Sequence, residues 1–288
     1  SKKPTIISCK TVIGFGSPNK ANSHAAHGAP LGVDEVALTK EAYGWDGSQQ
    51  FVVPEGVYEH FASGIGSRVG TVASEWHERL EAYTESHPTE FSQLSAIWND
   101  ELPAGWEDGI PEFEADEKGL ATRVSSGKVL NSVAQVYPWM IGGSADLAPS
   151  TMTNLDFEDA GELSAATPGG RNIHFGVREH SMAAICNGLS LSGLRSFCAT
   201  FFVFTDYLRP SLRLSSIMHQ PVIYVMTHDS IGLGEDGPTH QPISHLASCR
   251  AIPGLRVFRP ADANEVAQTY KTLLIDQYNF LNYLQILL

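Results

Sequence analysis

The sequence predicts an α/β fold built on a parallel sheet. Short apolar, β-branched and aromatic runs, such as residues 222–226, have the composition of strands that are buried on both faces of a sheet. Helical patterns alternate with these runs, as at residues 181–191 after the extended segment 172–177. Loops rich in glycine, proline and polar residues follow the strand-like runs. Alternating strands and helices favour parallel pairing, because a parallel connection needs a crossover segment.

The composition excludes several classes of function. The chain has 288 residues, of which 42% are hydrophobic, and a formal net charge of −13, so it can bury a sizeable core but lacks the basic surface of a nucleic-acid-binding protein. No apolar run is long enough to cross a bilayer, and the first residues do not resemble a signal peptide. The four cysteines are far apart and show no C-x-x-C spacing, which predicts free thiols in a reducing compartment.

The first third of the chain mixes short elements with loops. Residues 5–8 have a strand-like composition, and residues 34–43 have the spacing of a short helix with Asp34 as its N-cap. Residues 72–99 follow a helical pattern that Pro88 is expected to break into two helices.

The sequence divides into four regions. Residues 101–118 are rich in proline, glycine and acidic residues without apolar periodicity, which predicts a linker. This places one domain at residues 1–100 and a second at 119–272, followed by an atypical apolar and aromatic tail at 273–288.

In the second domain, a helix is expected with the apolar face Val129, Leu130, Val133 and Val136. Residues 140–142 lead into a run of small residues, 143–150, that holds Asp146 and Ser150. A helix is expected at 208–217, and another begins near 264 after a strand that ends near 258.

The loop after residues 222–226 is the strongest candidate for a site. It carries three histidines and three carboxylates among several glycines and prolines, namely His228, Asp229, Glu235, Asp236, His240 and His245. In open α/β sheets, ligands bind beyond the carboxyl ends of the strands, where this loop projects. A solvated acidic loop with incidental histidines is the alternative.

Three further features are ambiguous from the residues alone. Phe201, Phe204 and Tyr207 recur every three residues, which aligns rings on one face, although such a stripe more often packs in a core. Glu179 at a strand-to-helix junction also suits a favourable charge in the first helical turn. Arg123 on its own is an ordinary surface cation.

Several strings resemble transketolases, which are thiamine-diphosphate enzymes. The strings are T-H-D-S-I-G-L-G-E-D-G-P-T-H-Q-P, F-G-V-R-E-H, I-G-F-G-S-P-N-K, H-G-A-P-L-G, A-T-R and G-G-S-A-D-L, and the resemblance covers about residues 4–272. It implies the thiamine-diphosphate-binding fold. The first domain would be the C-terminal part of the diphosphate-binding domain, and the second would be the pyrimidine-binding domain.

The resemblance also implies cofactor roles. Glu179 would activate the cofactor, because a carboxyl group bonded to the aminopyrimidine favours the imino tautomer that removes the thiazolium C2 proton and gives the ylid. Such a carboxyl group needs a partly apolar site. The rings of Phe201, Phe204 and Tyr207 would enclose the pyrimidine. His27 would reach the diphosphate and the substrate, and Asp146 would lie near the cofactor.

Substrate roles follow in the same way. Arg123 and Ser150 would contact the substrate phosphate, for which the arginine fork is suited. His228, Asp236 and His240 would line the substrate pocket, with His27 and His240 taking part in catalysis. No metal ligand is expected in this chain. The Mg²⁺ (or Ca²⁺) ligands would belong to an N-terminal part that this sequence lacks.

The implied function is transketolase activity: reversible transfer of a two-carbon ketol group from a ketose phosphate to an aldose phosphate, in the pentose phosphate pathway or the Calvin cycle. The residues of these motifs most resemble those of photosynthetic transketolases, so cytoplasm and plastid stroma are both expected locations. The full-length protein would be a homodimer that binds neither nucleic acid nor membrane. This chain alone is expected to be inactive.

Four alternatives stay open. Dihydroxyacetone synthase and 1-deoxyxylulose-5-phosphate synthase are related enzymes with similar motifs. A metal-dependent hydrolase could use His228, Asp229 and His240 as ligands. A non-catalytic assembly partner, such as a split-gene subunit, would gain activity only when the missing portion is added.

Overall fold

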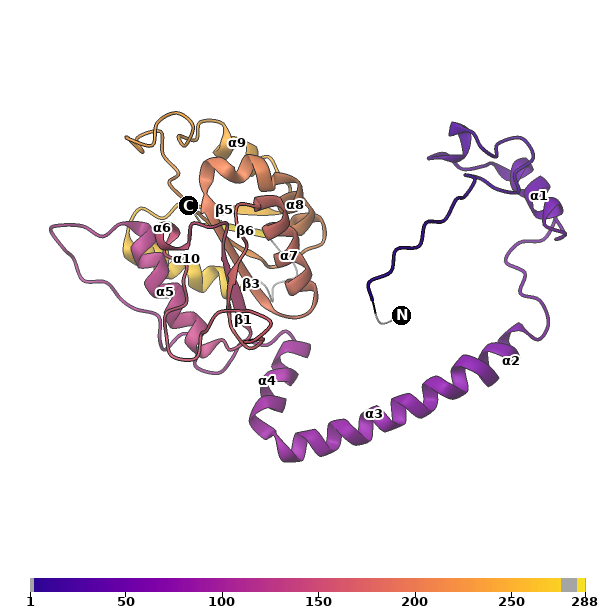
Figure 1. The fold of residues 1–288 in the computed structure, drawn as a ribbon, viewed down its shortest axis with the longest axis horizontal. Helices are drawn as coiled ribbons and strands as arrows, with labels where there is room; N and C mark the ends of the chain where they lie inside the picture. The colour runs from indigo at the N-terminus through magenta and orange to yellow at the C-terminus, as the bar shows by residue number, and fades with distance from the viewer. Residues whose placement is uncertain (1–2, 276–283, 288) are drawn as a thin grey trace. The chain divides into compact units, whose positions relative to one another are not determined.

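The computed structural model describes residues 3–275 and 284–287, and the chain divides into two units (Figure 1). Unit 1 comprises Ser1–Glu81 and unit 2 comprises Ala82–Leu288. Each unit is described by itself below. Within the described residues, no helix is long and apolar enough to cross a membrane.

Unit 1 is mostly helix and loop. Its elements are η1 (His24–Ala26), α1 (Val33–Ala42), α2 (Val57–Phe61), η2 (Ala62–Gly66) and the first part of α3 (Ser67–Ser86). The helix expected at 34–43 is therefore confirmed, but the prediction that Asp34 is its N-cap is wrong: Gly32 is the N-cap, and Asp34 lies within the first turn. The strand expected at residues 5–8 is wrong: these residues form no ladder, because no strand lies within the described part of unit 1 to supply hydrogen-bond partners.

A buried carboxylate fixes the loop before α1. Glu35 is 7% exposed and accepts hydrogen bonds from the Ser17 hydroxyl and, at 2.9 Å each, from the backbone and side-chain amides of Asn19. These bonds stabilise the ionised form and lower the pKa of Glu35 to about 2. The side chain thus stays charged and holds the loop against the helix.

Unit 2 contains the sheet and most of the helices. Its helices are α4 (Pro88–Trp98), α5 (Thr122–Val136), α6 (Ala148–Thr151), α7 (Glu179–Leu191), η3 (Phe202–Phe204), α8 (Thr205–Ile217), α9 (His245–Arg250) and α10 (Ala263–Ile275). Its strands are β1 (Met140–Ser144), β2 (Asn172–His174), β3 (Arg195–Phe201), β4 (Ile223–Thr227), β5 (Leu255–Phe258) and β6 (Leu284–Leu287). Pro88 is the first residue of α4, a position where its missing N–H costs no hydrogen bond, so the expected break falls there.

All pairings between the described strands are parallel, which confirms the predicted fold class. The strand order is β2-β1-β3-β4-β6-β5. The tail expected at 273–288 thus contributes a strand that lies between β4 and β5, and residues 276–283 of that tail lie outside the described residues.

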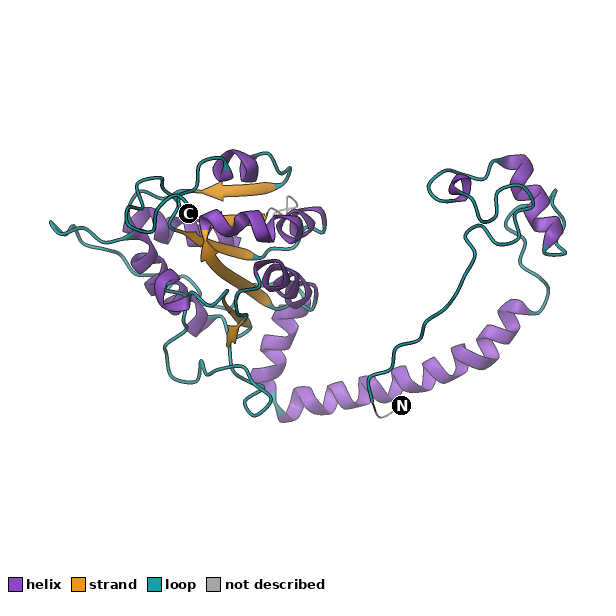
Figure 2. Ribbon diagram, turned by 45° about the horizontal axis from the view of Figure 1, so that its top comes forward, coloured by secondary structure: helices purple, strands orange, loops and turns teal. Residues whose placement is uncertain are grey.

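Helices cover both faces of the sheet (Figures 1 and 2). Side chains that alternate along the central strands β3 and β4 pack against different helices. Phe197 and Val225 pack in one apolar cluster with α5 and α10, whereas Cys198 and Tyr224 pack in a second cluster with α7 and α8. Successive side chains of a strand point to opposite faces of the sheet. A strand with apolar side chains on both faces therefore needs helices on both faces to bury them.

The segment expected as a linker packs on unit 2. Residues 99–121 contain no helix or strand, but Trp106 is only 8% exposed and joins the cluster of α5 and α10. The amide of Asn264 on α10 makes two hydrogen bonds of 2.9 Å with the backbone of Phe113. The predicted domain boundary stays a prediction, since the division into units falls at residue 81.

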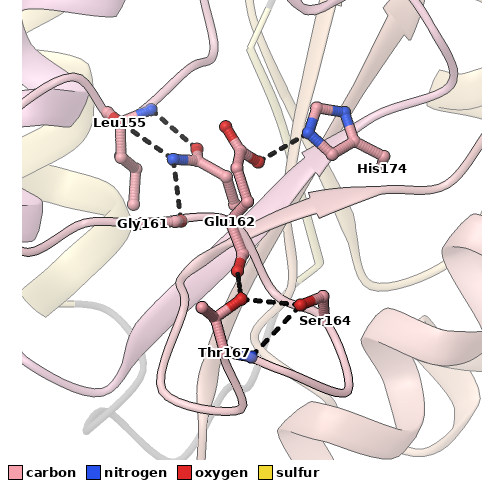
Figure 3. A network of polar contacts seen from close by, with 7 residues as sticks. Leu155, Gly161, Glu162, Ser164, Thr167 and His174 are labelled. Carbon is pink, nitrogen blue, oxygen red and sulfur yellow. Dashed lines mark hydrogen bonds and ion pairs between the residues drawn. The ribbon is translucent and has the colours of Figure 1, made fainter.

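Strand β2 is held at the sheet edge by polar contacts. The Asn172 amide accepts a hydrogen bond from Leu155 N at 2.9 Å and donates to the carbonyls of Leu155 (2.9 Å) and Gly161 (3.2 Å). Two residues further along β2, His174 Nε2 lies 2.5 Å from a Glu162 carboxylate oxygen (Figure 3). The strand is shorter than the segment 172–177 expected from the sequence.

Candidate functional site

The predicted site residues of unit 2 share one edge of the sheet. In a parallel sheet all strands end on the same side, so the residues that follow β1 to β5 gather there. Asp146 follows β1, Glu179 follows β2, Phe201 ends β3 and His228 follows β4. The helix α5 precedes β1, so its N-terminal residue pair Thr122 and Arg123 lies toward the same edge.

Three aromatic rings form a row where β3 passes into α8. The ring centroids of Phe201 and Phe204 are 6.1 Å apart with planes at 13°, and those of Phe204 and Tyr207 are 6.0 Å apart with planes at 25°. The backbone forms this row by changing from strand through the 3₁₀ turn η3 into α8. Tyr207 is 63% exposed, so the outer part of the row is accessible to a flat ligand ring.

His228 lies against the inner end of this row. Its ring stacks on Phe201, with centroids 3.8 Å apart and planes at 30°. Thr227 Oγ1 is 2.9 Å from His228 Nδ1, so one ring nitrogen is already engaged. Burial lowers the pKa of His228 below 6.5, and the nearby positive charge of Arg123 lowers it further, although the charge of Asp236 acts in the opposite direction. The ring is therefore neutral at pH 7.

His240 approaches the same aromatic row from the glycine-rich loop. Its ring meets Phe204 edge-on at 5.4 Å and Phe201 at 6.1 Å. Thr239 Oγ1 is 2.8 Å from His240 Nδ1. The loop therefore places both histidines beside the aromatic row, and the exposed Asp236 lies on the same loop, with its charge acting on His228.

Arg123 and Ser150 are brought together at the edge. The Arg123 guanidinium donates a hydrogen bond of 2.9 Å to the backbone carbonyl of Ser150. Arg123 and His228 also line one cavity of about 270 Å³, together with Leu233 and Val266. This cavity combines apolar walls with the Arg123 cation and with Asp229, whose charge is paired with Arg259, so Arg123 is the charged group that could bind an organic anion.

Glu179 is the first residue of α7 and is only 8% exposed. Helices α7 and α8 lie side by side, joined by Asn187 Nδ2 donating to the Ser211 carbonyl at 3.1 Å and by a contact of 3.1 Å between Ser211 Oγ and His180 Nδ1. Both helices begin at the carboxyl edge, so their first turns are neighbours. Glu179 therefore begins the helix that packs against α8, the helix into which the aromatic row leads.

Two predicted residues stand apart from these contacts. Asp146 is exposed and has a φ of 62°, a left-handed conformation that turns the chain sharply after β1. His27 lies in unit 1, where it caps η1 and is exposed. The cofactor roles of both residues stay predictions.

The structure also shows an ion pair and a histidine–carboxylate contact that sequence reasoning missed. Arg259 Nε donates to an Asp229 carboxylate oxygen at 2.6 Å, and His245 Nε2 lies 3.0 Å from an Asp206 oxygen. His245 is buried, whereas Asp206 is exposed. The only signal in the sequence was the position of Arg259 directly after a strand, and no local pattern links it to Asp229.

The residues present fit one half of a thiamine-type cofactor. A row of flat rings, a buried carboxyl group on the neighbouring helix and two histidines suit an aromatic heterocycle. Among the residues that the structure describes, no group of three or more His, Cys, Asp or Glu side chains is placed to hold a metal ion. Nothing here favours the metal-dependent hydrolase.

Family models match both parts of the chain. The model of the transketolase pyrimidine-binding domain matches residues 118–280. The model of the transketolase thiamine diphosphate binding domain matches residues 1–103.

Individual proteins agree with these matches. The chain is 51% identical over 273 residues to a transketolase of Geobacillus stearothermophilus, covering 94% of this chain and 40% of that protein. It is 52% identical over 271 residues to the chloroplastic transketolase-1 of Arabidopsis thaliana, covering 93% of this chain and 36% of that protein. The chain thus spans about two fifths of the length of these relatives.

Solved structures give the same picture. The transketolase of Leishmania mexicana matches with a TM-score of 0.84 and 39% identity, over 96% of this chain and 40% of that one. The transketolase of Campylobacter jejuni matches with a TM-score of 0.81 and 37% identity, over 100% of this chain and 42% of that one.

Proposed function

Since this chain belongs to the transketolase family, we propose that it supplies the pyrimidine-side half of a transketolase active site. The full-length protein would transfer a two-carbon ketol group from a ketose phosphate to an aldose phosphate. The observation that carries the proposal is the aromatic row beside the helix that begins with Glu179, at the edge where His228 and Arg123 also lie.

When bound, thiamine diphosphate supplies a carbon nucleophile that takes up and releases the ketol unit. The rings of Phe201, Phe204 and Tyr207 would hold its aminopyrimidine ring and exclude water from it. The Glu179 carboxyl would form a hydrogen bond with a pyrimidine nitrogen. Because Glu179 is buried, water would compete little for this hydrogen bond.

The remaining residues act on the sugar. Arg123 binds the phosphate as a cation, and Ser150 lies beside it. His228, neutral at pH 7, accepts or donates a hydrogen bond to the substrate, while His240 moves a proton near the substrate carbonyl. Asp236 receives a hydroxyl group of the donor. By the resemblance, Asp146 would lie near the cofactor, and His27 would contact the cofactor diphosphate and the substrate.

The divalent cation, the oligomeric state, the substrates and the location are proposed from the relatives. A divalent cation, Mg²⁺ or Ca²⁺, would be held outside this chain together with the diphosphate. The full-length protein would be a homodimer, and sugar phosphates of the pentose phosphate pathway or the Calvin cycle would be its substrates. Both a bacterial cytoplasm and a plastid stroma are compatible locations, since relatives of both kinds match.

The decisive experiment measures ketol transfer by the full-length protein with and without thiamine diphosphate and Mg²⁺. Glu179→Gln should lower kcat by about a hundredfold or more, the scale of a lost acid–base contribution. The matched control is Glu158→Gln, an exposed glutamate of unit 2, which should leave activity unchanged.

Transfer that needs no cofactor, or that survives Glu179→Gln at full rate, would overturn the proposal. The related synthases make different predictions. A 1-deoxyxylulose-5-phosphate synthase would release carbon dioxide from pyruvate, and a dihydroxyacetone synthase would accept formaldehyde in preference to an aldose phosphate. The relatives compared above are transketolases, which does not favour either alternative.

A further inference from the structure

His228 has an unusual backbone. Its φ is 57°, in the left-handed region that side chains other than glycine rarely adopt. Such a conformation persists only where the surroundings fix it, and it concentrates at functional sites. Thr227 and Phe201 hold the imidazole ring, but neither contact fixes the chain that leaves His228.

The next residue supplies that restraint. Asp229 pairs with Arg259 through an N–O contact of 2.6 Å, with the two side chains 26% and 47% exposed. Asp229 follows β4 and Arg259 follows β5, yet these strands are not neighbours, since β6 lies between them. The ion pair therefore ties together the ends of two strands across the end of a third.

The pair also borders the candidate substrate cavity. Asp229 lines it together with His228 and Arg123. A shift of Asp229 would turn the peptide that joins it to His228 and would move the imidazole away from Phe201. The first turn of the loop that follows is held only within itself, by hydrogen bonds from Gly232 N to Ser230 Oγ at 3.0 Å and from Leu233 N to the Ser230 carbonyl at 3.3 Å, and these bonds do not tie it to another strand.

We propose that Arg259 is a positioning residue for substrate binding. Through Asp229 it holds His228 in its left-handed conformation at the rim of the cavity, without touching the substrate itself. This inference rests on the proposed function. It adds Arg259, which follows β5, to a candidate set that contains no residue from the end of that strand.

The test uses the full-length enzyme with its cofactor. Arg259→Gln should raise KM for a ketose phosphate donor by about three- to fivefold, the scale of a partly exposed ion pair, and leave kcat nearly unchanged. Asp229→Asn should have a similar effect, and the double variant should be no worse than either single one. Arg259→Lys should recover part of the loss, because lysine restores the charge but not the planar fork.

Two measurements separate positioning from folding. Exchange of the C2 proton of bound thiamine diphosphate reports the Glu179 half of the site, and it should be unchanged in Arg259→Gln. Arg250→Gln, an exposed cation in the last turn of α9, is the matched control and should leave KM unchanged.

The proposal fails if KM does not change in Arg259→Gln, if the effects of the two single variants add in full, or if proton exchange falls together with substrate binding. Failure of the proposed function would give a different result. Exchange of the C2 proton would then be the same in the Glu179→Gln variant as in the wild-type protein.

Discussion

At the scale of single residues, the candidate histidines differ in how firmly they are held. Both have a threonine hydroxyl beside Nδ1, but His228 also has a stacked ring and a left-handed backbone, whereas His240 meets the aromatic rings only edge-on. Stacking on Phe201 contributes about 0.5–1.5 kcal/mol beyond area burial. His228 is therefore suited to a fixed contact, and His240 to a group that adjusts during the reaction.

The titration of His228 gives a prediction. Its pKa should lie below 6.5 in the folded protein, and Arg123→Gln should raise it, because a repelling positive charge is removed. Resonances of the imidazole in NMR spectra recorded across pH 4 to 8 would measure both values. Arg250→Gln should leave the pKa unchanged, and an equal rise in both variants would contradict the assignment to Arg123.

The lowered pKa of His228 also makes the stability of the folded protein depend on pH. With its pKa lowered on folding, His228 binds fewer protons in the folded state than in the unfolded state. Its contribution to stability is complete above pH 6.5 and declines as the pH falls toward the folded pKa.

At the scale of elements, strand β2 depends on one side chain. Asn172 is 5% exposed and supplies the three hydrogen bonds that join β2 to the segment 155–161. The neighbouring loop closes on itself through Thr167, which hydrogen-bonds to Ser164 and to the Glu162 carbonyl (Figure 3). β2 leads into α7, so the edge strand sets where Glu179 begins its helix.

Asn172→Ala should lower the free energy of unfolding by about 2–3 kcal/mol, because it leaves the buried backbone N–H and carbonyl of Leu155 without the partners that the Asn172 amide supplies. Urea denaturation followed by circular dichroism would measure it. Asn154→Ala, an exposed asparagine nearby, should change the free energy by less than about 0.5 kcal/mol. Equal losses in the two variants would show that the Asn172 network does not hold the strand.

At the scale of the whole molecule, the chain spans 40% of the length of the Geobacillus stearothermophilus transketolase. We propose that its candidate residues form the pyrimidine side of the site. The resemblance implies that the Mg²⁺ ligands lie in a part of the full-length protein outside these 288 residues.

The 288-residue chain alone should therefore show no ketol transfer with thiamine diphosphate and Mg²⁺, even at saturating donor and acceptor. The full-length protein measured beside it in the same assay should be active. Turnover by the short chain would show that the pyrimidine side suffices for catalysis. Activity gained only on adding a separate protein with the missing part would instead fit the split-gene alternative.

The sequence by itself determined the parallel α/β class, the helices at 34–43 and 181–191, the break at Pro88 and the aromatic alignment of Phe201, Phe204 and Tyr207. These features depend on neighbouring residues, whose periodicity and turn chemistry are local. It missed β3, because the aromatic spacing after residue 200 suggests a helix, and it placed a strand at residues 5–8, although the described part of unit 1 contains no strand to pair with it. The resemblance, rather than periodicity, supplied the roles of Glu179 and Arg123.

Only the tertiary structure decided the strand order, with β6 between β4 and β5, and hence the ion pair of Asp229 and Arg259 across it. It alone placed His228 on Phe201 and Arg123 against Ser150. These partners are distant in sequence, so no local pattern encodes their contact. They meet because a parallel sheet gathers the ends of all its strands at one edge.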